Sequence, residues 1–433
     1  FTQVDHFSLP RHDLAVALWP SYLRDAVAQP FDLAGDLLLR AQVLHDAAPA
    51  DGGESALLLT FHHSIIDLWS GQILLRELVA LYARELGETV TLPEPVQFGD
   101  YAVWLREPQQ VAAREQLHGY WAKRLAQLPV ALEIPFSEPR GQAGSALCER
   151  IPVSLPAKLS AALKRFADAT GTTPFVVVLT AFHAVLARYS GMDDIAIGVA
   201  VVNRAQQQTQ AIVGFLAENM VSRNVSESSQ SFQALTEQVR DHMLEDMRHQ
   251  ELPFDEVVNI VNPERRKGLA PLFQAMLVFQ TMPPLEAQAG AVRARATSVP
   301  LPAARADLVL ELDAGAEDIA GGLEYRSNFI DPQLAAAMAG SLEVLLEAGL
   351  ADPQLPLSQL PLQRHAAARD MLAKLNPPLP EPSSHTLSAW FVEQATRTPG
   401  AVALIENDQE VTYAELDRRS AALAAHLAQL GVS

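Results

Sequence analysis

Cysteine, membrane-length apolar runs and positive charge are scarce in this sequence of 433 residues. The single cysteine, Cys148, excludes an internal disulfide framework, and nothing near it in the sequence would activate it as a nucleophile. No uninterrupted apolar span of about 18 residues and no secretory leader is present, so we expect a soluble cytoplasmic protein. The formal charge of −19, from 51 acidic and 32 basic residues, argues against nucleic acid or an anionic membrane as a partner.

The length predicts a globular chain of two to three domains. Hydrophobic residues make up 49% of the sequence, which is enough to build large cores. The clearest change in composition is at residues 375–384 (LNPPLPEPSS), where four of the ten residues are proline. Such a segment is typical of an extended, semi-rigid linker.

The stretch around which the sequence is organised is HHSIIDLWS at residues 62–70. The apolar run before it, residues 56–61 (ALLLTF), predicts a buried strand, and residues 71–86 after it repeat apolar side chains at helical spacing. The two histidines therefore lie where a strand ends and the chain turns toward a helix. A loop held from both sides by rigid elements is a common place for reactive side chains.

Spacing alone leaves three interpretations of His62, His63 and Asp67 open. The histidines could serve packing and hydrogen bonding at a strand end, which is the usual role of an isolated pair. They could belong to a metal site, although two histidines and one aspartate supply three ligands and no fourth lies nearby in the sequence. They could perform acid–base or substrate-positioning chemistry at neutral pH, with the aspartate fixing the loop.

HHSIIDLWS resembles the HHxxxDG signature of the condensation domains of nonribosomal peptide synthetases, which belong to the chloramphenicol acetyltransferase-like superfamily. Four further motifs of this family are matched in the expected order. They are FGDYAVWLRE (98–107), IGVAVVNR (197–204) with VGFLAENMVSRN (213–224), HQELPFDEVV (249–258) with PLFQAMLVFQ (271–280), and residues 307–312 followed by GGLEYRSNFID (321–331). Five ordered motifs over about residues 1–350 make the resemblance specific.

The resemblance implies an α/β (α+β) fold of two chloramphenicol acetyltransferase-like lobes, arranged as a V-shaped pseudo-dimer with a channel between them. We assign residues 1–145 to the N-terminal lobe, with its front segment missing, and residues 146–365 to the C-terminal lobe. Residues 366–386 are the predicted linker. Residues 387–433 resemble the beginning of an adenylation domain, most specifically at VTYAELDRRS (411–420). Because the phosphate-gripping loop of that family is not among them, this chain should not activate amino acids.

Peptide-bond formation is the activity that the resemblance implies. The amine of an acceptor aminoacyl thioester attacks the carbonyl of a donor acyl or peptidyl thioester. Both are held on phosphopantetheine arms that upstream and downstream carrier proteins supply, and the domain needs no metal or cofactor of its own. We expect His63 to hydrogen-bond the attacking amine and accept its proton, His62 to orient the loop, and Asp67 to hold the shape of the loop. Four further residues are expected to line the substrate channel: Trp69, Asn203, Arg204 and Asn219.

Three departures from the family pattern bear on this assignment. Leu68 follows the aspartate where the family usually has glycine, and since glycine permits positive φ and close backbone approach, leucine is expected to narrow the channel or change the substrate. AENM at residues 217–220 stands where many members have VNT. An earlier RHxxLR-type block, which often supplies the arginine that pairs with the motif aspartate, is absent. We therefore expect Asp67 to lack its partner, which is costly for a buried carboxylate.

Two alternative functions are compatible with the same superfamily assignment. One is an O-acyltransferase, and the other is a catalytically inactive carrier-docking module, which Leu68 and the absent front block motivate. An epimerization domain shares the histidine motif but is not normally followed by the beginning of an adenylation domain. A heterocyclization domain carries DxxxxD in place of the histidine pair.

The C-terminal lobe offers local predictions of structure. Residues 174–189 are apolar on most faces and predict a buried helix with His183 in the core. The glycine pair at 321–322 predicts a bulge or a close backbone approach in a strand. Asp331, followed by a proline, is a plausible N-cap of an alanine-rich helix, and Gly171 is a plausible C-terminal cap of the helix at 156–170.

Overall fold

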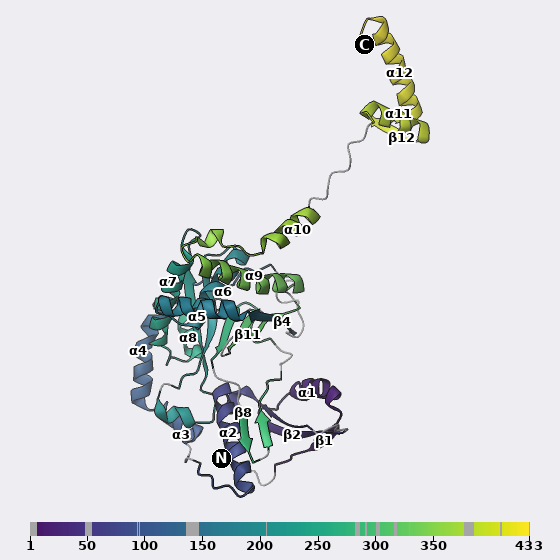
Figure 1. Cartoon of the computed structure of the whole chain (residues 1–433). Coiled ribbons are helices and arrows are strands. Elements are labelled where there is room, and N and C mark those ends of the chain that lie inside the picture. Colours follow the sequence, from purple (N-terminus) through teal and green to yellow (C-terminus); the bar gives the residue numbers. More distant parts are fainter. Residues whose placement is uncertain are drawn as a thin grey trace. The chain divides into compact units, whose positions relative to one another are not determined.

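The computed structural model describes the chain except for residues 1–6, 48–53, 93, 95, 136–146, 205, 282–285, 291, 300–303, 316–317, 329, 376–384, 408 and 433. The chain divides into two compact units, Phe1–Arg364 and His365–Ser433 (Figure 1). The first unit contains both of the predicted lobes, and each unit is described by itself.

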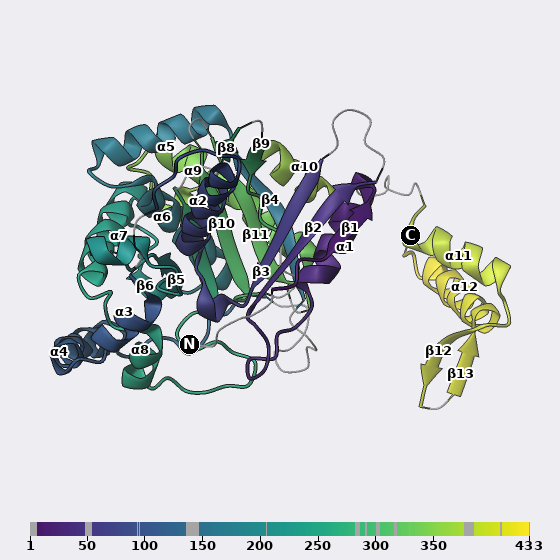
Figure 2. The same ribbon diagram turned by 90° about the horizontal axis from the view of Figure 1, so that it is seen from below.

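The first unit begins with a three-stranded sheet, in which β2 (Leu39–Asp46) lies between β1 (Arg11–Leu14) and β3 (Ser55–Phe61). β2 pairs parallel with β1 and antiparallel with β3. Helix α1 (Trp19–Val27), preceded by a 3₁₀ turn, lies beside these strands in Figure 2. β3 is the predicted strand after which the histidines come, but it lies at the sheet edge and only Leu58 in it is buried. The prediction of a buried strand is therefore wrong, because most of its residues are only partly buried.

Three helices follow the histidine loop: α2 (Leu68–Glu85), α3 (Phe98–Trp104) and α4 (Pro108–Arg124). The last turn of α4 packs into the core of the sheet that comes later in the chain, where Trp121 and Leu125 are buried. Residues 133–144, a stretch rich in proline and glycine that predicts the crossing between the two lobes, lie mostly outside the described residues. Helix α4 therefore connects the histidine-bearing part of the chain to the second sheet through apolar contacts.

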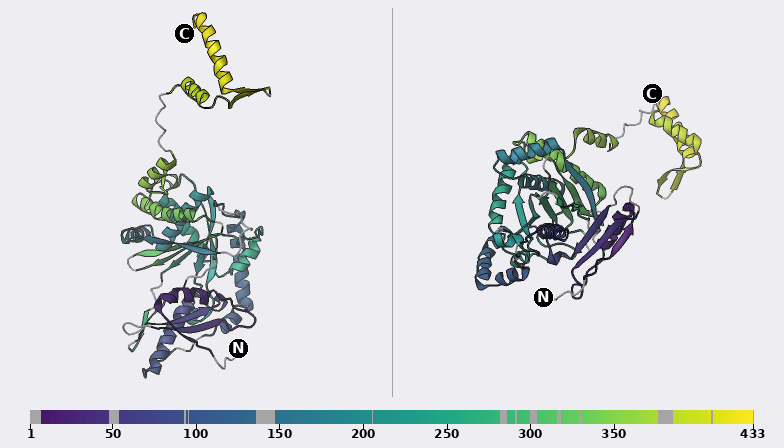
Figure 3. Two further views of the ribbon diagram at one scale, coloured as in Figure 1. Left: turned by 90° about the vertical axis from the view of Figure 1, so that its right-hand side faces the viewer. Right: turned by 60° about the horizontal axis from the view of Figure 1, so that its bottom comes forward.

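The second sheet has six strands in the order β4-β11-β10-β7-β5-β6. Its strands are β4 (Cys148–Leu155), β5 (Asp194–Val201), β6 (Glu218–Val225), β7 (Ala275–Gln280), β10 (Leu308–Ala314) and β11 (Ile319–Arg326). β7 pairs parallel with β5 and β10, and the other neighbours pair antiparallel. The mixed sheet with its helices confirms the predicted α/β class (Figure 3).

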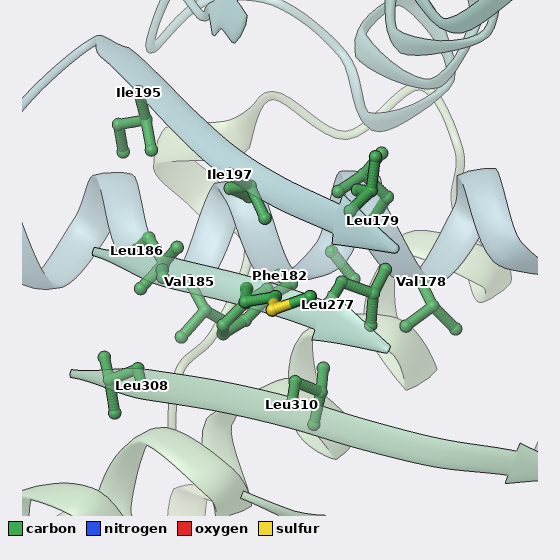
Figure 4. Packing of buried hydrophobic residues seen from close by; sticks show 14 of the residues in the cluster. Val178, Leu179, Phe182, Val185, Leu186, Ile195, Ile197, Leu277, Leu308 and Leu310 are labelled. Carbon is green, nitrogen blue, oxygen red and sulfur yellow. The ribbon is translucent and has the colours of Figure 1, made fainter. Parts of the chain in front are cut away.

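Helices α5 (Ala157–Ala169), α6 (Pro174–Ser190), α7 (Phe232–Met247) and α9 (Pro332–Ala351) pack with one another and with this sheet. α6 is the central one, and all of residues 176–186 are buried. Figure 4 shows its side chains, among them Phe182, against Ile197 of β5 and Leu277 of β7. The prediction of a buried helix is confirmed, and so is His183 as a core residue, whose Nε2 lies 2.9 Å from the Asn224 carbonyl oxygen.

The local backbone predictions are also confirmed. A Cβ on Gly321 would lie 2.0 Å from the carbonyl oxygen of Glu311 on the neighbouring strand, so this strand requires glycine at the close approach. Gly171 has φ of +61° directly after α5. Asp331 accepts backbone hydrogen bonds at the N-terminus of α9. α9 is long and apolar enough to cross a membrane, but eight of its residues are buried in the core of this unit.

Two further elements complete the first unit: helix α8 (Phe254–Val261) and a hairpin of β8 (Glu286–Ala289) and β9 (Val292–Arg295). The second unit contains α10 (His365–Leu375), α11 (Leu387–Arg397), a hairpin of β12 (Val402–Glu406) and β13 (Gln409–Thr412), and α12 (Tyr413–Gln429). α10 occupies the first half of the predicted linker, residues 366–386. The proline-rich half lies mostly outside the described residues.

Candidate active site

The side chain of His62 makes its hydrogen bonds within the loop in which it lies. It precedes a single 3₁₀ turn, His63–Ile65, and its Nδ1 accepts a hydrogen bond from the Ser64 backbone N–H at 3.3 Å. The same nitrogen lies 2.8 Å from Ser64 Oγ. The ring also meets Phe31 edge-on, with centroids 6.1 Å apart. These contacts tie the His62 ring to its own loop and to Phe31; its role in orienting the loop stays a prediction.

His63 is exposed, and the loop is not sealed inside the protein. Its imidazole makes an edge-to-face contact with Phe215, with ring centroids 5.0 Å apart and an interplanar angle of 75°. Phe215 lies just before β6, so this contact joins the loop after β3 to a segment from the second half of the unit. An exposed imidazole at this place can meet a substrate without any rearrangement of the loop.

Asp67 is buried and ends the loop as the N-cap of α2. Its Oδ1 accepts the Ser70 N–H at 2.7 Å, which supplies a partner for one of the free backbone donors of the first helical turn. Its Oδ2 accepts the N–H groups of Leu216 and Ala217 at 3.1 and 3.2 Å. The carboxylate therefore holds two segments at once, one on each side of the site.

Arg204 is the charged partner of this carboxylate. Its Nη2 lies 3.0 Å from both oxygens of Asp67, and the arginine is itself buried. The expectation that Asp67 lacks a partner is therefore wrong, because the arginine comes from the matched NR motif and not from the front block. The guanidinium also donates to the carbonyl oxygens of Thr209 and Ile212, at 2.7 Å each. Both Nη atoms thus bond inside the protein and the residue is 6% exposed, which differs from the expected channel-lining position of Arg204.

The surroundings of Asp67 keep it ionised. Burial alone would raise the pKa of its carboxyl, but the hydrogen bonds from Ser70 and from the Arg204 guanidinium, with the charge of that guanidinium, lower the pKa below its ordinary value. A carboxylate that already accepts these bonds is a poor proton acceptor at neutral pH. The geometry thus gives Asp67 a structural task, while the neighbouring His63 side chain is exposed.

The other predicted channel residues lie at different places. The Trp69 indole N–H donates to the Gln210 carbonyl oxygen at 2.9 Å, which adds a tie between α2 and the segment before β6. Asn203 has φ of 47°, a left-handed conformation that asparagine tolerates better than most residues, and it turns the chain directly before the buried Arg204. Asn219 is exposed at the start of β6.

Asn219 and Asp194 each line a small pocket in the described part of the first unit. Asn219 lines one of them, with an empty volume of about 230 Å³, together with Trp121, Met220, Val221, Gln250, Leu252, Phe254 and Val257. The other, of about 210 Å³, lies beside the start of β5 and is lined by residues that include Asp194 and Gln274. Neither cavity is lined by His62 or His63. Among the described residues, no group of three or more His, Cys, Asp or Glu side chains could hold a metal ion, so the metal interpretation has no ligand set there.

Sequence reasoning missed Ser70 and Gly214. Ser70 Oγ donates to the Gly214 carbonyl oxygen at 2.7 Å and accepts the Gly214 N–H at 3.0 Å. A Cβ on Gly214 would come within 2.2 Å of the Phe98 ring, so the motif that begins at Phe98 presses on the same segment. A signal for Ser70 was present: it lies three residues after an N-cap aspartate, where its N–H meets the capping carboxylate.

Leu68 begins α2 with an ordinary helical backbone. The positive φ that glycine would allow is therefore not used at this position, and leucine causes no backbone strain. Its side chain is 51% exposed, immediately after the capping aspartate. The substitution adds exposed apolar surface near the histidine loop and leaves the fold of the loop intact.

Residues 11–372 match the sequence pattern of the condensation domain family. The chain is 34% identical to phosphinothricin tripeptide synthetase PhsC of Streptomyces viridochromogenes, over 100% of this chain and 40% of that protein. It is also 34% identical to phosphinothricin tripeptide synthetase PhsB of the same organism, over 98% of this chain and 36% of that protein. With malpibaldin synthetase of Mortierella alpina it shares 33% identity, over 93% of this chain and 7% of that protein. The chain thus spans less than half of these curated relatives.

Solved structures share the fold. A four-domain nonribosomal peptide synthetase, holo-AB3403 bound to AMP and glycine, superposes with a TM-score of 0.84 at 20% identity, over 99% of this chain and 33% of that one. The X-domain from teicoplanin biosynthesis superposes with a TM-score of 0.73 at 21% identity, over 82% of this chain and 81% of that one. The predicted chloramphenicol acetyltransferase-like fold is confirmed.

Proposed function

The chain belongs to the condensation domain family, and on that premise we propose that it forms peptide bonds between two substrates held on carrier proteins. The donor is an acyl or peptidyl thioester and the acceptor is an aminoacyl thioester, each on a phosphopantetheine arm. The acceptor amine attacks the donor carbonyl, a C–N bond forms, and the C–S bond breaks to release the donor arm as a thiol. Two of the relatives named above are tripeptide synthetases, which supports this reaction class.

Modest chemical assistance is enough for this reaction. An α-amino group has a reference pKa of about 7.7–8.0, so a useful fraction of the acceptor is already neutral near neutral pH. Holding two tethered reactants in line is worth roughly 7–11 kcal/mol of the barrier. A positioned general base adds roughly 10²–10⁴-fold. Orientation by the protein therefore contributes more than proton transfer.

The single observation that carries the proposal is that His62, His63 and Asp67 within HHSIIDLWS differ in burial and in hydrogen bonding. Asp67 is buried and paired with Arg204, His62 is tied to its own loop, and of these three side chains only that of His63 is exposed. Its imidazole would accept a hydrogen bond from the attacking amine and take the proton that the tetrahedral intermediate sheds. Trp69, Asn203 and Asn219 remain the proposed channel residues, and of these Trp69 ties α2 to the segment before β6 through the Gln210 carbonyl oxygen.

The partners follow from the same proposal. An upstream carrier protein would deliver the donor and a downstream one the acceptor, and the two arms would meet in a channel between the lobes. We assign residues 387–433 to the beginning of an adenylation domain of the same longer chain, in the cytoplasm. These residues form α11, the β12–β13 hairpin and α12 of the second unit.

A reconstituted assay tests the proposal. The protein is mixed with one carrier loaded with an acyl or aminoacyl donor and a second carrier loaded with an aminoacyl acceptor, and the second carrier is examined by mass spectrometry for the condensed product. An amine acceptor and a matched hydroxy-acyl acceptor are compared. Product with the hydroxyl acceptor alone would identify an O-acyltransferase, and carrier binding without any product would identify a docking module.

A further inference from the structure

In the described part of the chain, a ring contact with Phe215 orients the imidazole of His63. The imidazole makes no side-chain hydrogen bond among the described residues, and the contact that it does make is with the ring of Phe215. A histidine ring turns easily about its terminal side-chain bond, for which the preferences are broad. A ring without a hydrogen bond is therefore oriented by what it packs against.

The backbone on both sides of Phe215 is held in place from the histidine side of the site. Before it, Ser70 Oγ bonds both the N–H and the carbonyl oxygen of Gly214. After it, Asp67 Oδ2 accepts the N–H groups of Leu216 and Ala217. Four hydrogen bonds from two side chains thus fix the residues next to Phe215, and these two side chains follow His63 by only four and seven positions.

Two further contacts restrict the same segment. Arg204 holds the carbonyl oxygens of Thr209 and Ile212 while it pairs with Asp67. Gly214 packs directly against the Phe98 ring, which a Cβ at this position would meet at 2.2 Å. These contacts hold the segment between Phe98 and α2, and the side chain of Phe215, 42% exposed, is presented to His63.

We propose that Phe215 is the positioning residue for His63, and that Asp67, Ser70 and Arg204 act on the site by holding Phe215 against the imidazole. This inference rests on the proposed function for its catalytic consequence, but the ring contact itself can be tested without any turnover. An edge-to-face ring contact favours one orientation by roughly 2- to 10-fold over the alternatives. The expected loss of turnover on removing it is of that size.

The direct test is NMR of the full chain with isotope-labelled histidine, in which the His63 signal is assigned by its disappearance in His63→Gln. Phe215→Leu removes the aromatic ring, and Phe215→Tyr keeps it. We expect the His63 signal to move in Phe215→Leu, because the ring-current shift is lost, and to stay near its wild-type position in Phe215→Tyr. Leu244→Ala removes another exposed apolar side chain, 53% exposed on α7, and is expected to leave the signal unchanged.

Ser70→Ala tests the second half of the inference, since it removes both hydrogen bonds to Gly214 and leaves Phe215 in the sequence. We expect the His63 signal to move as it does in Phe215→Leu. An unchanged His63 signal in Phe215→Leu would overturn the assignment of Phe215, and an unchanged signal in folded Ser70→Ala would overturn the holding role. Circular dichroism of each variant establishes that it is folded.

Kinetics then separate this inference from the proposed function. With loaded carriers, Phe215→Leu should lower kcat about 2- to 10-fold and change KM for the acceptor carrier by less than about twofold, while Phe215→Tyr restores kcat. Equal rates in Phe215→Leu and wild type would remove Phe215 from the mechanism. If wild type forms no product, the proposed function fails while the NMR result still decides the ring contact.

Discussion

The guanidinium of Arg204 and the carboxylate of Asp67 lie 137 residues apart in the sequence and 3.0 Å apart in the structure, and both side chains are about 2% exposed. The pair fastens the histidine loop to the segment that follows β5. Because both charges are buried, each depends on the other for its stability. Motifs that are distant in the sequence therefore act as one structural unit.

Removing the carboxylate should destabilise the protein strongly. Asp67→Ala leaves Arg204 buried without its counter-charge and the Leu216 N–H without an acceptor, so we expect a loss of about 3–5 kcal/mol in the free energy of unfolding by urea. Glu245→Ala is the matched control, since it breaks an exposed pair with Arg248 and should cost no more than about 1 kcal/mol. Equal losses in the two variants would contradict a structural role for the buried pair.

The stabilisation from Asp67 should depend on pH with a definite sign. Its pKa is lowered in the folded protein, so folding is favoured by the ionised form. The contribution is fully present above the unfolded pKa of about 3.9 and is lost as the pH falls through the lower, folded value. Urea unfolding of wild type and Asp67→Asn, which cannot titrate, should therefore differ most near pH 7. The difference should begin to shrink below about pH 4; a difference that grew on acidification would refute the sign.

Substituting alanine for two glycines should change the stability of the protein in opposite directions, because a neighbouring backbone lies close to Gly321 and not to Gly340. Gly321→Ala places a methyl group 2.0 Å from the Glu311 carbonyl oxygen in the middle of the six-stranded sheet, which should cost roughly 1–3 kcal/mol or more. Gly340→Ala, on the exposed side of α9 with nothing within 4 Å, should stabilise by up to about 1 kcal/mol. Thermal unfolding of the two variants measures both. A stabilised Gly321→Ala would show that the strands are further apart than described.

Leu68→Gly tests the most visible departure from the family motif. Because Leu68 has a helical backbone and an exposed side chain, glycine should change the free energy of unfolding by no more than about 1 kcal/mol. Its effect should be on the range of donors accepted, measured as relative kcat/KM for a short and a bulky donor on the same carrier. An unaltered ratio would show that this side chain does not meet the donor.

Local sequence signals predicted local structure well. The apolar run at residues 174–189, the glycine pair at 321–322 and the Asp331 cap each determine backbone or burial within a few residues, and the structure agrees with them. The edge position of β3 was missed because burial depends on what covers a strand, and an apolar run contains no information about its neighbours. The helix α10 was missed because the prolines that follow it dominated the composition.

The candidate site was predictable in its residues and not in its pairings. The motif gave His62, His63 and Asp67, but the partner of Asp67 was sought in the front of the chain, while the structure supplies Arg204. A salt bridge across 137 residues has no local signal. Phe215 was missed for the same reason, since its ring contact joins segments that are distant in the sequence. The place of Ser70 after the N-cap was a local signal, but its bonds to the Gly214 backbone were not predictable from it.

In the proposed mechanism His63 takes the proton of the attacking amine, so the rate of the chemical step should depend on its imidazole. Single-turnover product formation is followed with a loaded donor carrier and a loaded acceptor carrier for wild type, His63→Ala and His62→Ala. We predict that His63→Ala slows the chemical step by roughly 10²–10⁴-fold, with carrier binding and the unfolding midpoint unchanged. His62→Ala should lose less, because its ring serves the loop. Wild-type rates in His63→Ala would contradict the assigned role.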